Sequence, residues 1–172
     1  MIIFDSSTLI LLARIDVLDL FLSNFEGTVV IPEKVRLEVS RSSKEGAESI
    51  NRYIEDKKVG VVKVKNAALV KRLMDDFSID AGEAETLTLA SGEKASIVAT
   101  DDRNAIRACK LLKLEFVTAV SFLIRAVEKG LLSKDEGVIK LEKLQSIGRY
   151  SKQILDDAAR QIREGKVWLQ KY

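Results

Sequence analysis

Apolar residues along this chain gather in short runs that are separated by longer stretches with helical spacing. The run at 1–4 stops at Asp5, which predicts a short buried strand ending at an acid. Three of the other runs are rich in β-branched residues, the residues that strands favour. Strands are therefore expected at residues 1–4, 28–31, 59–64, 95–100 and 115–118.

The intervals between these runs have apolar residues at helical spacing, and the first such helix is expected to break near Asp16. Helices are expected at residues 8–22, 32–39, 44–53, 67–77, 82–90, 104–112 and 119–128, with two more from 133 onward. Strands that alternate with helices indicate an α/β fold, with parallel strands joined by crossovers and helices on both faces. The chain shows no linker or internal repeat, so we expect one domain body at 1–130, with a helical extension at 131–172 packed on it.

Composition narrows the class of protein. Hydrophobic residues make up 47% of 172 residues, enough for a sizeable core. The apolar runs are too short to cross a bilayer, which takes roughly 20 residues. The first residues carry no basic segment and meet Asp5 at once, unlike a signal peptide. We therefore expect a cytoplasmic protein without membrane contact.

The chain has one cysteine and no histidine. This excludes a disulfide framework, a zinc site of the usual ligands and a Ser-His-Asp triad. Cys109 lies among helically spaced apolar residues, which favours a small core residue over a nucleophile. Any chemistry must therefore fall to carboxylates, whose oxygens favour hard cations such as Mg²⁺ or Mn²⁺.

Acids occur where such chemistry would need them. Asp5 follows the first strand, and Asp101 and Asp102 follow the fourth, so they are expected to meet at one edge of a parallel sheet. Glu38 and Glu85 lie early in helices that begin near that edge, on faces that also carry apolar residues. Each acid has a plainer interpretation as a helix cap or a solvated side chain, and Glu83 fits a helix-start acid best. The joint pattern is what indicates a metal site.

Four segments of the chain resemble, in order, the acidic motifs of PIN domains. They are Ile2-Ile3-Phe4-Asp5-Ser6-Ser7, Val35-Arg36-Leu37-Glu38-Val39, Gly82-Glu83-Ala84-Glu85-Thr86-Leu87 and Ala99-Thr100-Asp101-Asp102. The resemblance covers about residues 1–130. The Gly-Glu-Ala-Glu segment and Val117-Thr118-Ala119-Val120, leading to Lys129-Gly130-Leu131-Leu132, are similar to a prokaryotic subgroup of largely undefined role.

The resemblance implies a three-layer α/β/α sandwich around a parallel sheet and cleavage of RNA phosphodiester bonds with Mg²⁺ or Mn²⁺. By position, it assigns the catalytic and metal-binding roles to Asp5, Glu38, Glu85 and Asp102, with Asp101 as a further metal ligand. Many prokaryotic members (VapC-like) are dimeric toxins of toxin–antitoxin pairs, so an antitoxin partner and a homodimer are expectations. The third acid of the family is typically Asp, and here it is Glu85.

Supporting roles are assigned more broadly. Ser6, Ser7 and Thr100 are candidates to hydrogen-bond a ligand carboxylate or phosphate, or else to cap the helices that follow. The net charge of only +2 means that RNA binding would depend on local cations. The candidates are Arg41, Lys44, Arg103 and Arg107.

Two other functions are open to a chain with this pattern. The substitution of Glu85 for the usual Asp favours, as the alternative, a catalytically weak PIN scaffold that acts as an RNA- or protein-binding regulatory module. A flavodoxin-like nucleotide binder fits poorly, because no glycine-rich phosphate loop follows any expected strand.

Overall fold

The computed structural model describes residues 1–43, 45–93 and 96–165. A five-stranded parallel sheet with strand order β3-β2-β1-β4-β5 forms its centre. The strands are β1 (Ile2–Phe4), β2 (Val29–Pro32), β3 (Gly60–Val62), β4 (Ile97–Ala99) and β5 (Glu115–Val117). Every strand falls within a range expected from the sequence or one residue beyond it, so the expected parallel α/β fold is confirmed.

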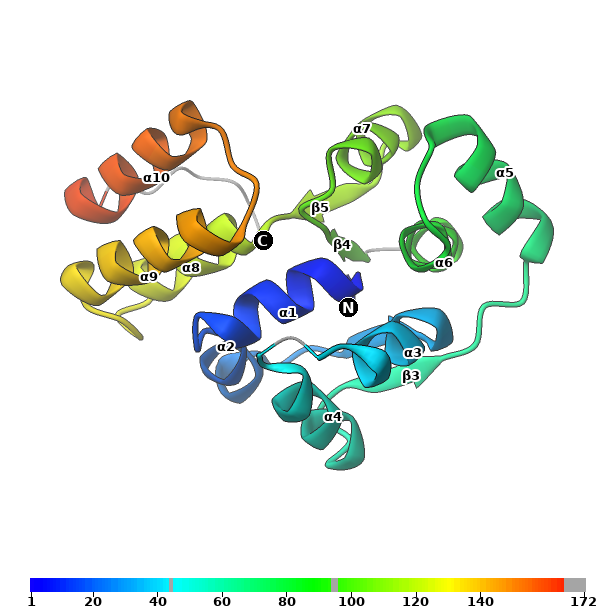
Figure 1. Cartoon of the computed structure of the whole chain (residues 1–172), viewed down its shortest axis with the longest axis horizontal. Helices are drawn as coiled ribbons and strands as arrows, with labels where there is room; N and C mark the ends of the chain where they lie inside the picture. The colour runs from blue at the N-terminus through cyan, green and yellow to red at the C-terminus, as the bar shows by residue number, and fades with distance from the viewer. Residues whose placement is uncertain (44, 94–95, 166–172) are drawn as a thin grey trace.

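Helices fill the intervals between the strands and continue after β5 (Figure 1). They are α1 (Ser6–Arg14), α2 (Leu18–Asn24), α3 (Glu33–Arg41), α4 (Ala47–Glu55), α5 (Ala67–Phe77), α6 (Ala81–Gly92), α7 (Arg103–Leu112), α8 (Ala119–Glu128), α9 (Lys134–Ile147) and α10 (Lys152–Glu164). The expected break of the first helix is confirmed: Asp16 has a left-handed backbone with φ 54°, which separates α1 from α2.

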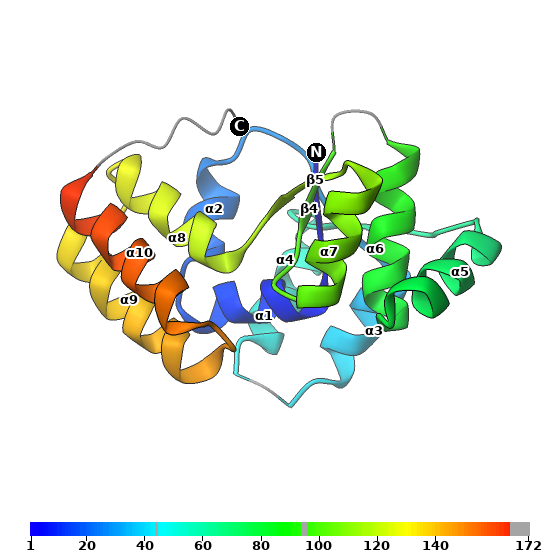
Figure 2. The ribbon, with the colours of Figure 1, turned by 90° about the horizontal axis from the view of Figure 1, so that it is seen from above.

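The sheet is covered on both faces, which makes three layers (Figure 2). Helices α5, α6 and α7 cover one face, where Ile3 and Val98 pack against Leu87 and other apolar residues. The opposite face is covered by α1, α2, α4 and α8, where Phe4 packs in a second core with Leu9. Successive residues of β1 therefore enter different cores, as strand geometry requires.

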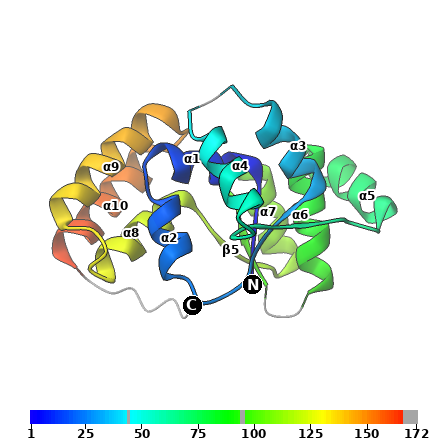
Figure 3. The same cartoon turned by 90° about the horizontal axis from the view of Figure 1, so that it is seen from below.

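Helices α9 and α10 form an outer pair against α8 and share the core of that layer (Figure 3). They contribute Leu141, Leu144, Leu155, Ala158 and Ile162 to it. The α8–α9 turn contains Gly130, whose φ of 70° suits glycine. A 2.7 Å hydrogen bond from Lys140 Nζ to the Ile15 carbonyl joins α9 to the α1–α2 break. Among the described helices, none combines the length and apolarity needed to cross a bilayer.

The strand order fixes where a site can form. From β1 the chain proceeds outward through β2 and β3, and then returns to place β4 on the other side of β1. In such doubly wound sheets the crevice lies beyond the carboxyl ends of the two strands at which the order reverses. Here those strands are β1, followed by Asp5, and β4, followed by Thr100 and Asp101.

Candidate active site

Asp5 is buried at the carboxyl end of β1, with 2% of its surface exposed. Its Oδ1 caps α1 by accepting a 2.7 Å hydrogen bond from the backbone N–H of Thr8. Its Oδ2 is buried and has no hydrogen-bond partner among the described residues. An unpartnered carboxylate oxygen in the protein interior is costly, and a bound cation would offset that cost.

Asp101, at the end of β4, is held from three directions. Its carboxylate accepts hydrogen bonds from the Thr8 hydroxyl at 2.8 Å, from the Ala119 N–H at 3.0 Å and from the Tyr150 hydroxyl at 2.7 Å. These donors belong to α1, to the start of α8 and to the α9–α10 connection. Asp101 therefore joins the edge of the sheet to the C-terminal helices.

Asp102 has a different environment. Its Oδ1 caps α7 by accepting hydrogen bonds from the N–H groups of Asn104 and Ala105 at 2.8 and 2.9 Å. Both oxygens of Asp101 accept hydrogen bonds from other elements, whereas the side-chain hydrogen bonds of Asp102 are local to its own helix. Of the two neighbouring acids, Asp101 thus connects several elements, whereas Asp102 caps its own helix and is only half-buried.

Glu38 reaches the same edge from α3. Its Oε2 accepts a 2.7 Å hydrogen bond from the Ser6 hydroxyl, which orients the carboxylate beside the start of α1. The close approach depends on Gly82, because a Cβ there would lie only 2.6 and 2.7 Å from the two carboxylate oxygens of Glu38. Gly82 therefore makes room for this acid between α3 and α6.

Two glutamates of α6 point to different neighbours. Glu83 forms a capping box with Asp80, with hydrogen bonds of 2.8 and 2.9 Å between each side chain and the other residue's N–H. Glu85 Oε2 accepts a 3.2 Å hydrogen bond from the Lys34 N–H, one of the free donors in the first turn of α3. Glu85 thus lies against α3, beside Glu38.

The acids along this edge perturb one another. Burial, with a smaller effect from the charge of Asp101, raises the pKa of Asp5 to about 6, although contacts from Thr100 and Thr8 oppose part of the rise. The pKa of Glu83 is raised to about 7, first by burial and then by neighbouring carboxylates, Asp102 and Asp5 among them. Burial also raises the pKa of Glu38, where Ser6 acts in the opposite direction. Glu83 therefore interacts electrostatically with the acids of this edge in addition to capping its helix.

A pH-dependent stability difference is expected between the natural chain and Asp5→Asn when both are measured in chelator. The pKa of Asp5 rises from 3.8 to about 6 on folding, so ionised Asp5 disfavours the folded state by about 3 kcal/mol. This penalty is absent below pH 3.8, grows as the pH rises from 3.8 to about 6 and stays constant above it. Asparagine does not ionise, so it has no such penalty, and it still caps the helix.

Urea denaturation at about pH 4 and about pH 7.5 measures this difference. The variant should gain stability relative to the natural chain only at the higher pH. Asp75→Asn, an exposed acid on α5, serves as the control. An equal difference at both pH values would contradict the burial of a charged Asp5.

The remaining sequence candidates are more dispersed. Ser6 contacts Glu38, and buried Thr100 accepts a 3.3 Å hydrogen bond from the Asp102 N–H. Ser7 is exposed in the first turn of α1. Exposed cations lie at the C-terminal end of α3 and along α7, while Lys44 lies outside the described residues. The exposed cations are Arg41, Arg103 and Arg107.

Three residues to which the sequence assigned no role in the site help to build this edge: Thr8, Gly82 and Tyr150. Thr8 follows Asp5 by three residues, the spacing of a helix cap, and that signal was present in the sequence. Gly82 could have been noticed as a glycine inside a helix, which often marks a close approach. Tyr150 had no local signal, since its partner Asp101 is 49 residues away.

The acids do not form a closed metal site in this conformation. Among the residues that the structure describes, no three acidic, histidine or cysteine side chains lie close enough together to hold an ion. The donor chemistry nevertheless suits a hard cation, because all the donors are oxygens and Asp5 Oδ2 is buried without a partner.

A doubly wound parallel sheet with acids at its reversal point defines the class of this protein as an α/β fold with an acidic sheet edge. The chain matches the family DUF3368, described as a PIN domain, over residues 1–164, and it therefore belongs to the PIN-domain family. The match extends beyond the expected 1–130 and includes α9 and α10. A comparison with curated proteins finds no significant match. The PIN domain is a nuclease-type fold.

Proposed function

We propose that this protein is a metal-dependent endoribonuclease that hydrolyses RNA phosphodiester bonds with Mg²⁺ or Mn²⁺. The observation that carries the proposal is the buried, unpartnered Oδ2 of Asp5 at the reversal point of the sheet, where Asp5 also interacts electrostatically with Asp101 and Glu83. Membership of a nuclease-type family supports the same activity.

The residues proposed to hold the cation are Asp5, Glu38 and Asp102, with Glu85 and Asp101 as the remaining acids of the motif. Glu83 joins them as a further candidate, because its carboxylate senses the charges of Asp102 and Asp5. When bound, a divalent cation lowers the pKa of its water and stabilises charge that develops on the phosphodiester.

The protein's own groups position these acids. Ser6 orients Glu38, and the Thr8 and Tyr150 hydroxyls fix Asp101. Arg103 and Arg107 are exposed on α7, which begins directly after Asp102, so they are placed to attract RNA phosphates to the edge. The cation-binding acids themselves would repel the RNA backbone until a cation neutralises them.

We propose a cytoplasmic location and a place in a toxin–antitoxin pair, with an antitoxin protein as inhibitor and a homodimer as the active state. These partner proposals are supported only by the prokaryotic PIN-domain resemblance. Purification of the native complex from the host cell and measurement of its mass would test the antitoxin and the homodimer together.

Two observations favour a second candidate, an RNA- or protein-binding regulatory module with weak or no catalysis. The described acids do not converge into a ligand group, and Glu85 is engaged by the Lys34 N–H. Such a module would bind RNA or a protein partner without requiring a cation.

Cleavage of a labelled single-stranded RNA by the purified chain tests the proposed function. Cleavage is expected with added Mn²⁺ or Mg²⁺ and should cease when EDTA removes the cation. In parallel, Mn²⁺ should raise the melting temperature, because a ligand that binds only the folded state stabilises it. If millimolar Mn²⁺ produces no cleavage and no thermal shift, the nuclease proposal is rejected and the module is favoured.

A further inference from the structure

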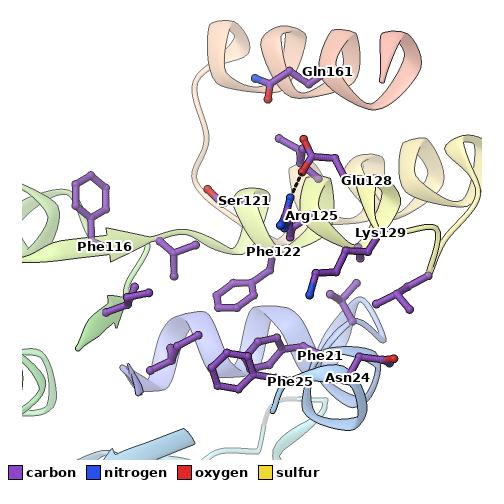
Figure 4. A pocket seen from close by; sticks show the side chains of 17 residues that line it. Phe21, Asn24, Phe25, Phe116, Ser121, Phe122, Arg125, Glu128, Lys129 and Gln161 are labelled. Atoms are coloured by element: carbon purple, nitrogen blue, oxygen red, sulfur yellow. Dashed lines mark hydrogen bonds and ion pairs between the residues drawn. The ribbon is translucent and has the colours of Figure 1, made fainter. Parts of the chain in front are cut away.

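An apolar groove lies at the opposite end of the sheet from the acids. Its lining includes Ile2 and Ile97, the first residues of β1 and β4, and its cavity measures about 290 Å³. Figure 4 shows phenylalanine rings gathered between α8 and α2. Phe21 lies 4.9 Å from Phe25 and 4.8 Å from Phe122 between ring centroids, and Phe116 of β5 lines the same groove.

The lining of this groove also includes charged residues of α8 and its C-terminal end, namely Arg125, Glu128 and Lys129. Arg125 and Glu128 of α8 pair with each other at 3.0 Å, which leaves the aromatic floor without a charge from them. Folded proteins seldom leave a contiguous apolar surface of this kind in water, because covering it is favourable. A segment with large apolar side chains is the occupant that such a floor fits.

The chain itself supplies a segment of that kind next to the groove. Gln161, in the last turns of α10, lines the groove and accepts a 3.0 Å hydrogen bond from the N–H of Gly165. A bond from Lys134 Nζ to the Arg163 carbonyl at 2.7 Å fixes this end of α10 against α9. The chain thus leaves α10 within one helical turn of the groove.

Residues 166–172 follow Gly165 and lie outside the described residues. Their sequence, Lys-Val-Trp-Leu-Gln-Lys-Tyr, contains four large apolar or aromatic side chains. Seven extended residues span at most about 24 Å, several times the rise of the helical turn that separates Gly165 from Gln161. The length of this segment and its apolar side chains therefore both suit the phenylalanine-lined groove.

We infer that residues 166–172 of the same chain dock in this groove, with Trp168 as the anchor against the phenylalanine floor. An aromatic side chain buries about 150–250 Å² of surface and gains further from edge or offset contacts with other rings. The covalent link gives the tail a high effective concentration at the groove, which favours it over the tail of a second molecule. The proposed occupant of the groove is therefore a segment of the same chain.

Trp168 is the only tryptophan of the chain, so its fluorescence reports this docking directly. In the native full chain, its emission should be blue-shifted relative to the urea-unfolded protein. Its acrylamide quenching constant should be at least roughly threefold lower, because a docked indole is reached only through local opening. Both properties should be independent of protein concentration.

Ile124→Ser, in the half-buried lining of the groove, should raise the quenching constant and shift the emission to the red. Ile139→Ser is the matched control, since Ile139 is 65% exposed on α9 away from the groove, and it should change neither. Leu169→Ser alters the tail alone and should act like Ile124→Ser without disturbing the folded core. Circular dichroism establishes that each variant is folded.

Three results would overturn the inference. They are unfolded-like emission from the native chain, an emission that shifts to the red on dilution, and equal responses of the Ile124 and Ile139 variants. The second would assign the groove to the tail of another copy of the chain.

Discussion

Asp5→Asn is expected to reduce metal-dependent RNA cleavage by roughly a thousandfold, which corresponds to about 4 kcal/mol of lost transition-state stabilisation. The carboxylate of Asp5 carries the buried oxygen that has no partner in the protein, and asparagine cannot supply its negative charge. The same variant keeps an oxygen that can accept the Thr8 N–H at the start of α1. Activity should therefore be lost while the fold remains.

Initial cleavage rates at saturating Mn²⁺, measured beside circular dichroism and urea unfolding, test this prediction. Asp75→Asn removes an exposed acid from α5 and should leave the cleavage rate unchanged. If the Asp5 variant cleaves as fast as the natural chain, the acidic edge is not the catalytic centre.

Asp101→Ala is expected to lower the free energy of unfolding by about 3 kcal/mol or more, because hydrogen bonds to charged groups contribute about 1.5–3 kcal/mol each and do not add fully. The substitution leaves the hydroxyls of Thr8 and Tyr150 and the Ala119 N–H without their shared acceptor. Asp102→Ala removes only a helix cap, which typically costs about 1 kcal/mol.

Urea unfolding of the two variants, compared at one pH, separates these roles. The Asp101 variant should have the lower midpoint, and Tyr150→Phe should reproduce part of its loss. Cleavage should be the more sensitive readout for Asp102→Ala, the proposed ligand. A larger loss of stability for Asp102→Ala than for Asp101→Ala would reverse this division of roles.

The sequence predicted the fold well because its signals were local. Each strand is a short apolar run that ends at a polar residue or proline, and each helix shows apolar spacing over two or more turns. The break between α1 and α2 was visible at Asp16. Parallel pairing followed from the alternation of strands and helices.

The candidate site was only partly predictable. The prediction that Asp5 and Asp101 lie on one edge required only that the strands be parallel. The electrostatic effect of Asp101 on the pKa of Asp5 agrees with this prediction. The directions of Glu83 and Glu85 depend on how α6 is rotated against α3, which sequence spacing does not give. Likewise, the contact of Tyr150 with Asp101 results from the packing of α9 and α10 on α8.

The Tyr150–Asp101 bond also has a consequence for the order in which a ribosome makes this chain. Asp5 is translated before Asp101, Tyr150 follows Asp101 by 49 residues, and the α10 residues of the shared core come after Tyr150. Domains generally fold as units during synthesis, at about 5–20 residues per second. The acidic edge therefore acquires the Tyr150 hydroxyl only after the sheet and Asp101 have been made, so a product that terminates before Tyr150 would lack one of the donors that hold Asp101.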